Sequence, residues 1–208
     1  IPFVRYEQGE SQADFTYGYS HSIRDGVCRP ILFPSYEGEL TWLSDGREHR
    51  ATFEDGLTFE RQRERLKTAL LQETWLGPVL SDAHAELQRL RKQEQADAGG
   101  LIVTMNQDHA RQVADLVLKL TGTRALVAVS DDPSASKTIE TFAHHKQQQW
   151  LVAVNMVSEG VDIPRLRVGV YATNVLTEMY FRQVVGRFVR MQEKVPKPQR
   201  AWLYLPKD

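Results

Sequence analysis

Short apolar runs alternate with amphipathic stretches in the second half of the chain, from residue 99 to residue 208. The apolar runs are LIVTM, ALVAV, WLVAV, RVGVYAT and AWLYL. Stretches with helical periodicity lie between them, near residues 107–120, 134–146 and 180–190. Because strands that are apolar on both faces must be covered on both sides, this pattern predicts an α/β fold, with a parallel sheet and helices on both of its faces.

The first half of the chain has a different pattern. Residues 1–56 contain short β-type runs separated by turn sequences such as SDGR and EDG, which indicates a strand-rich lead-in. Residues 57–98 consist mainly of helix formers with leucines at helical spacing, and we expect a break at Gly77-Pro78. The pattern therefore predicts two helices between the lead-in and an α/β core that spans residues 99–208.

Composition and charge limit the functions that the chain can have. The 208 residues carry a formal net charge of -1, so nucleic-acid binding would need a local basic patch. The single cysteine, Cys28, excludes an internal disulfide, and the six histidines lack metal-ligand spacing, so we expect no metal site. The sequence contains neither a secretory leader nor an apolar run of about 18 residues, which favours a cytoplasmic setting without membrane contact.

Polar residues follow three of the predicted strands. Ligands of doubly wound sheets bind at the carboxyl ends of the strands, so these residues are candidates for a site. We expect four of them to lie along one edge of the sheet: Asn106, Ser130, Gly160 and Asp162. The alternative interpretation is that the polar residues only cap the following helices, since Asp108 and Ser134 are typical N-cap residues.

The stretch YFRQVVGRFVR, residues 180–190, is expected to form an amphipathic helix. At about 100° per residue, one face is apolar and contains Phe181, Val184, Val185 and Phe188. Gln183, Arg187 and Arg190 gather on the opposite face. Gly186 costs a helix roughly 1 kcal/mol relative to alanine, which suggests close approach by another backbone or a ligand. Paired guanidinium groups suit phosphate oxygens, although ordinary surface ion pairs, for instance with Glu178, are the alternative.

Three segments resemble the motifs of a known family. QVVGRFVR resembles motif VI of the superfamily 2 helicases and translocases, whose pattern is Gln-x-x-Gly-Arg-x-x-Arg. MVSEGVDIP is similar to motif V, LIVTMNQ is similar to motif IV, and the order and spacing of the three also match. TYGYSHSIRDGV resembles the segment before the second lobe in helicases related to type I and type III restriction enzymes. The resemblance implies the C-terminal RecA-like lobe of a motor of this family, which includes the DEAD/DEAH-box helicases.

The resemblance also implies roles for particular residues. Arg187 and Arg190 would be arginine fingers that reach the phosphates of ATP, with Gln183 helping to position them. Three residues would lie beside the nucleotide: Gly160, Asp162 and Gly186. Contacts with the sugar-phosphate backbone of nucleic acid, which carry little sequence information, would come from Thr104, Asn106, Gln107, Ser130, Ser158 and Glu159.

The sequence lacks a Gly-x-x-x-x-Gly-Lys-Ser/Thr phosphate loop and a strand that ends in an Asp-Glu box for magnesium. We therefore expect ATP and magnesium to be bound mainly by an N-terminal RecA-like lobe of the same polypeptide, and we expect no hydrolysis by this chain alone. The expected nucleic acid is DNA. One alternative is a catalytically silent RecA-like module that binds nucleic acid or a protein. Another is an unrelated enzyme domain that uses Asp162 or Glu159 as a general acid or base.

Overall fold

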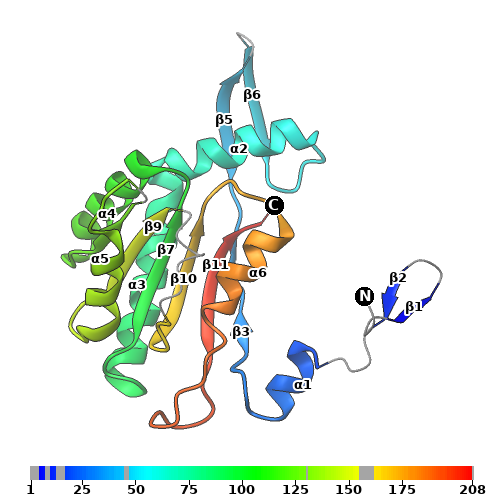
Figure 1. The fold of residues 1–208 in the computed structure, drawn as a ribbon. Helices are drawn as coiled ribbons and strands as arrows, with labels where there is room; N and C mark the ends of the chain where they lie inside the picture. Colours follow the sequence, from blue (N-terminus) through cyan, green and yellow to red (C-terminus); the bar gives the residue numbers. More distant parts are fainter. Residues whose placement is uncertain are drawn as a thin grey trace.

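A computed structural model describes residues 5–7, 10–12, 17–44, 47–129, 131–154 and 162–207. Its centre is a seven-stranded sheet in the order β3-β11-β10-β7-β9-β8, with β4 also paired to β11 (Figure 1). The pairings within this sheet are parallel. Its strands are β3 (Ile31–Leu32), β4 (Ser35–Tyr36), β7 (Gly99–Thr104), β8 (Leu126–Ala128), β9 (Trp150–Val154), β10 (Leu166–Ala172) and β11 (Ala201–Pro206).

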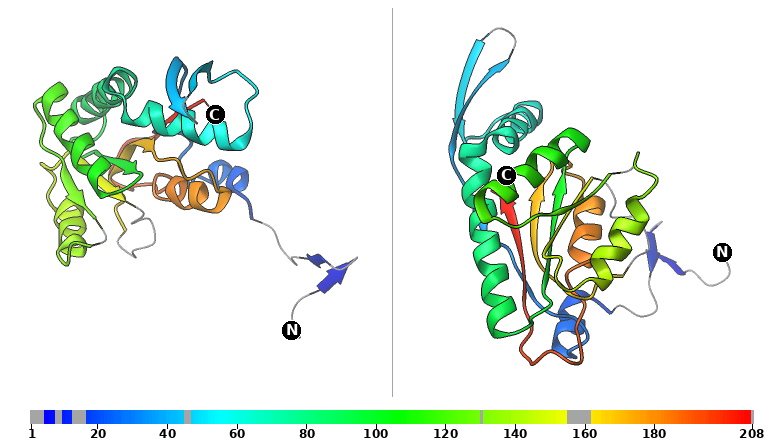
Figure 2. Two further views of the ribbon diagram at one scale, coloured as in Figure 1. Left: turned by 90° about the horizontal axis from the view of Figure 1, so that it is seen from above. Right: turned by 90° about the vertical axis from the view of Figure 1, so that its left-hand side faces the viewer.

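Helices cover both faces of the sheet. On one face lie α3 (Glu73–Gln93) and α4 (Gln107–Thr121), which share a buried apolar cluster with alternate residues of the central strands. The other face carries α5 (Ala135–His144) and α6 (Glu178–Gly186) with a second cluster. The right-hand view of Figure 2 shows the sheet between these two layers. The predicted α/β architecture, with a parallel sheet and helices on both faces, is therefore confirmed.

The lead-in contributes both to the main sheet and to structure outside it. β1 (Arg5–Glu7) and β2 (Glu10–Gln12) pair with each other, and α1 (Tyr19–Arg24) precedes β3. β3 and β4 pair with β11 and so belong to the core sheet. β5 (Glu39–Ser44) and β6 (Arg47–Thr52) then form an antiparallel hairpin that leads to α2 (Phe59–Leu71). In Figure 1 this hairpin projects beyond the end of the sheet.

The break between the two helices of the middle segment lies at Gln72 and not at Gly77-Pro78, so that prediction is wrong. Gln72 has extended backbone angles (φ -90°, ψ 119°) between α2 and α3. Pro78 lies inside α3 and removes one hydrogen-bond donor from the helix. Continuation of α3 through Pro78 buries a long apolar stripe, which offsets that loss: Leu76, Val79, Leu80, Ala83, Leu87 and Leu90.

His109, a buried residue in the first turn of α4, joins this helix to the end of α2. Its Nε2 lies 2.9 Å from the carbonyl oxygen of Leu70, and its Nδ1 lies 3.3 Å from the backbone nitrogen of Met105. The Met105 amide can only donate, so Nδ1 accepts and Nε2 carries the proton that is donated to Leu70. Burial lowers the pKa of His109, and the neutral ring is therefore the form that fits the fold.

We expect the stability of the protein to decrease in mild acid because of His109. The unfolded chain, with a histidine pKa of about 6.5, takes up a proton before the folded protein does. Stability that is present above this pH is therefore lost as the pH falls toward the folded-state pKa, by at most about 1.4 kcal/mol per pH unit. Denaturant unfolding of the wild type and of His109→Gln at several pH values measures the effect. Burial also lowers the pKa of His84, which is present in both proteins, so identical pH dependence would refute this role of His109.

Candidate functional site

The two arginines of the motif VI segment lie at the end of α6 and beyond it. α6 ends at Gly186, and Arg187 is the C-cap residue (φ -72°, ψ -22°). The amides of residues 187 and 188 bond to carbonyls three residues earlier, which tightens the last turn. Arg190 lies past this turn, in an isolated antiparallel bridge with Cys28. The prediction that Arg190 belongs to the helix is therefore wrong, because the backbone leaves the helix before it.

The apolar side of this segment is packed as the sequence predicts. Val184 and Phe188 are fully buried, and Phe181 and Val185 pack against the same cluster. Phe188 lies on β10 at Gly169, where a Cβ atom would be only 2.5 Å from the Phe188 ring. Gly169 thus allows the close approach that fixes the turn bearing Arg187. Gly169 was not among the predicted site residues, although a glycine inside an apolar strand signals such an approach.

The polar side of α6 is at least partly accessible. Gln183 and Gly186 are exposed, and Arg187 is half-buried. Gln183 and Arg187 are four residues apart, so they are neighbours on the helix surface. A Cβ atom at Gly186 would meet no other described atom within 4 Å. Packing within the described parts of the chain therefore gives no reason for a glycine here, and the close approach that the sequence suggests stays a prediction.

Asp162 and Arg190 form an ion pair beside the end of α6. Arg190 Nη1 lies 3.2 Å from Asp162 Oδ2, and the two side chains are 57% and 49% exposed. Asp162 comes four residues before the start of β10. It therefore lies at the amino edge of the sheet, whereas Asn106 follows the carboxyl end of β7. The prediction that these two residues share an edge is wrong, because the chain must return to the amino edge before a parallel strand can begin.

The residues after β7 include one that is not accessible. Thr104 is fully buried, and its Oγ1 donates a hydrogen bond to the carbonyl oxygen of Ala153 at 3.1 Å. Its predicted contact with nucleic acid does not fit this arrangement, because the side chain is enclosed between strands. Asn106 is exposed and Gln107 is half-buried at the start of α4. Both of these are therefore available at the carboxyl edge.

Asn106 also has a structural role. It is the N-cap of α4, and its Oδ1 accepts a hydrogen bond from the backbone nitrogen of His109 at 2.9 Å. The capping interpretation is thus correct for this loop, but with Asn106 in the place expected for Asp108. Ser134 is the N-cap residue of α5 without a side-chain capping bond. The remaining predicted site residues lie outside the described ranges: Ser130, Ser158, Glu159 and Gly160.

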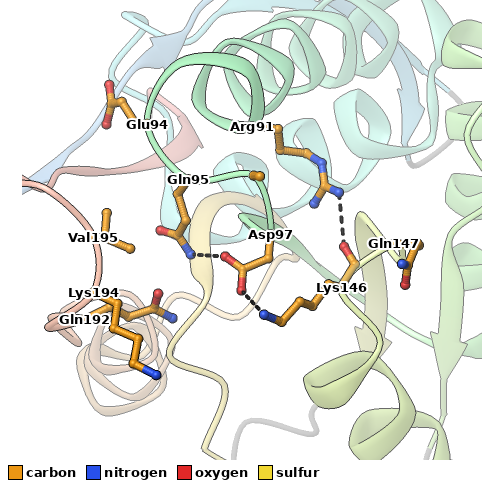
Figure 3. Close-up of a pocket in the computed structure, with 10 residues that line it drawn as sticks. Arg91, Glu94, Gln95, Asp97, Lys146, Gln147, Gln192, Lys194 and Val195 are labelled. Atoms are coloured by element: carbon orange, nitrogen blue, oxygen red, sulfur yellow. Dashed lines mark hydrogen bonds and ion pairs between the residues drawn. The ribbon is translucent and has the colours of Figure 1, made fainter.

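A polar cavity of about 460 Å³ lies near the amino edge, between the end of α3, the end of α5 and the loop after Arg190 (Figure 3). It contains none of the predicted site residues. Some of its lining side chains bind each other: Asp97 accepts from Gln95 Nε2 at 3.1 Å and lies 3.7 Å from Lys146 Nζ. Arg91 donates to the carbonyl oxygen of Lys146 at 3.0 Å. These contacts connect the ends of two helices across the cavity.

The described residues form neither a metal site nor a membrane-spanning helix. No group of three or more His, Cys, Asp or Glu side chains in these ranges could hold a metal ion. In the same ranges, no helix is both long and apolar enough to cross a membrane. The predicted site residues that the structure describes at the amino edge are two guanidinium groups, one carboxylate and one amide: Arg187, Arg190, Asp162 and Gln183.

No family model matches the sequence. Uncharacterized protein Rv2917 of Mycobacterium tuberculosis is 44% identical over 197 residues, which cover 91% of this chain and 32% of that protein. Uncharacterized protein ML1624 of Mycobacterium leprae is also 44% identical over 197 residues, covering 91% of this chain and 33% of its own length. The chain thus spans about one third of the length of these relatives.

Two solved structures resemble the chain over most of its length. One is a fragment of a putative HsdR subunit of a type I restriction enzyme from Vibrio vulnificus, with a TM-score of 0.58, 18% identity, and coverage of 90% of this chain and 33% of that one. The other is the ATP-dependent Type ISP restriction-modification enzyme LlaBIII bound to DNA, with a TM-score of 0.54, 13% identity, and coverage of 95% and 14%. At such identities the likeness concerns the fold alone, a parallel sheet between layers of helices that is consistent with a RecA-like fold.

Proposed function

We propose that the chain is the second motor lobe of an ATP-dependent nucleic-acid helicase or translocase. The observation that carries this proposal is the position of Arg190, which lies half-exposed beside Asp162, just past the polar end of α6 where Arg187 is found. Two permanent cations within one four-residue stretch, directly after Gly186, suit the phosphates of a nucleotide that another domain presents.

The proposed chemistry is phosphoryl transfer from ATP to water. Magnesium and the β- and γ-phosphates would be held mainly by a first RecA-like lobe of the same polypeptide. Arg187 and Arg190 would approach when the lobes close and stabilise the negative charge that develops on the γ-phosphoryl group. Gln183 would orient Arg187 from the preceding turn, while Asp162 would orient Arg190 or contact the ribose. Gly186, and Gly160 by its place in motif V, would allow close approach of the nucleotide.

Nucleic acid would bind at the other edge of the sheet. Asn106 and Gln107 are available there, and the resemblance adds Ser130, Ser158 and Glu159 from the loops after β8 and β9. DNA is the proposed form, in line with the DNA-bound Type ISP enzyme that shares the fold. The segment between β9 and β10 connects the carboxyl edge to the amino edge, so one segment would contact both ligands. Contacts with backbone phosphates of this kind would position DNA without reading its sequence.

The test compares the full-length polypeptide with this chain alone. We expect the full-length protein to hydrolyse ATP in the presence of magnesium, with a rate that DNA increases, and we expect the isolated chain to be inactive under the same conditions. Steady-state hydrolysis with single-stranded DNA, duplex DNA and RNA measures both. A full-length protein that binds nucleic acid without hydrolysing ATP would favour the silent module, and turnover by the isolated chain would reveal a complete active site within it.

A further inference from the structure

Arg29 is a buried arginine that contacts both segments of the proposed nucleotide site. It has no exposed surface. Its backbone amide donates to the carbonyl oxygen of Val189 at 2.8 Å, and the residue before it bridges to Arg190. Its Nη2 donates to the carbonyl oxygen of Pro164 at 2.7 Å, two residues after Asp162. One side chain and its backbone therefore connect the two segments that bear the exposed ion pair.

The backbone of Arg29 is itself fixed by α1. The hydroxyl group of Tyr19 donates to the carbonyl oxygen of Arg29 at 2.9 Å and accepts from the backbone nitrogen of Ile31 at 3.1 Å. These bonds tie Arg29 to the first helix and to the start of β3. The backbone that carries the guanidinium group is thus fixed by hydrogen bonds where the side chain reaches Pro164. A residue that positions another segment requires such a fixed backbone.

Burial of this cation is poorly compensated. Two of its nitrogens, Nε and Nη1, are buried without a hydrogen-bond partner among the described residues. Burial and the nearby Arg167 guanidinium lower the pKa of Arg29 to about 9, so the group is still charged at neutral pH. An apolar side chain of similar volume would avoid this desolvation cost, and a buried charge is by itself weak evidence for a stabilising role. The arrangement therefore favours a role other than stability.

We propose that Arg29 is a positioning residue: it holds Asp162 and Arg190 in the relative position that ATP hydrolysis requires. This inference rests on the proposed function. The ion pair cannot maintain this relative position alone, because ion pairs between half-exposed side chains contribute little stabilisation and are screened by salt. Arg29 is buried, so water does not compete for its hydrogen bond with the carbonyl oxygen of Pro164. The lead-in segment thereby becomes part of the nucleotide site without touching the nucleotide.

The test uses the full-length polypeptide with DNA and ATP. Arg29→Met should lower kcat by roughly 10- to 100-fold, since small displacements of catalytic groups have effects of this size. The KM for ATP should change by less than about threefold, because the first lobe provides most of the binding. Arg29→Lys should recover part of kcat, since an ammonium group can still donate to Pro164. Arg65→Met is the matched control: Arg65 is equally buried but lies in α2, where it donates to the carbonyl oxygen of Thr52.

A double-mutant cycle separates positioning from general stability. In an Arg190→Ala background, Arg29→Met should lower kcat no further, because the group that it positions is already absent. The inference would be overturned if the kcat losses of Arg29→Met and Arg190→Ala multiplied in the double variant. It would also be overturned if Arg65→Met lost as much kcat as Arg29→Met. If Arg29→Met does not fold, Arg29→Lys must show the same non-additivity. A loss in Arg190→Ala without any loss in Arg29→Met overturns this inference alone, whereas a wild type that does not hydrolyse ATP overturns the proposed function with it.

Discussion

Replacing Arg187 or Arg190 with alanine in the full-length polypeptide should lower DNA-stimulated ATP hydrolysis by about 10³- to 10⁵-fold, the contribution of an arginine finger in other phosphoryl-transfer enzymes. The fold should survive. Arg190 is more than half exposed and Arg187 is half-buried, so either change should alter the free energy of unfolding by less than about 1 kcal/mol. Nucleotide binding should largely persist, because the first lobe is proposed to hold the phosphates. The measurements are kcat, nucleotide affinity and the thermal midpoint.

Arg182→Ala is the control for this experiment. Arg182 lies on the same helix, and its Nη2 lies 2.6 Å from Glu178 Oε1 in a pair whose side chains are both 76% exposed. Its removal should change kcat by no more than about twofold, since exposed pairs contribute little. Near wild-type hydrolysis by folded Arg187→Ala and Arg190→Ala proteins would show that the end of α6 is a structural element, and the motor proposal would lose its main support.

The second large effect is expected at Phe188, and it concerns folding. Phe188 is fully buried against β10, so Phe188→Ala should cost roughly 3 to 5 kcal/mol of stability. The thermal midpoint should fall by roughly 6 to 20 °C, at about 2 to 4 °C per kcal/mol for a domain of this size. Thermal unfolding followed by circular dichroism measures the shift. Phe59→Ala is the matched control, because the Phe59 ring in α2 is 61% exposed, and a comparable shift there would contradict the explanation from burial.

The sheet could be predicted from the sequence because a strand that is buried on both faces needs a continuous run of apolar residues. Each of the five apolar runs became a strand, with LIVTM in β7 and AWLYL in β11. The ends of helices were less predictable, because local signals compete with packing. Pro78 is an ordinary helix-breaking signal, yet the stripe of α3 that contains Leu87 outweighs it. Arg190 continues a helical pattern, yet its backbone pairs with Cys28, which is far away in sequence.

The candidate site was only partly predictable, because contacts between segments that are distant in the sequence decide its arrangement. Motif spacing identified Arg187 and Asp162, but it did not show that Asp162 lies at the opposite edge from Asn106. The return of the chain between two parallel strands decides this, and it is visible only in the topology. Arg29 was not predicted, because its place in the site depends on a contact with Pro164 that no local pattern records. Gly169, by contrast, had a local signal of its contact with Phe188, since it is a glycine inside an apolar strand.

The pairing of β3 and β4 with β11 has a consequence for how the molecule can be divided. A fragment that starts at β7 would contain all three motifs, but it would leave the main-chain groups of β11 along that edge unpaired. It would also uncover the face that α3 protects, including residues around Val168 and Val170. Open edges and bare apolar faces promote association between chains, so such a fragment would be prone to aggregate. A fragment that is to stay folded should therefore begin ahead of α1, so that the lead-in stays attached to the half of the chain that bears the motifs.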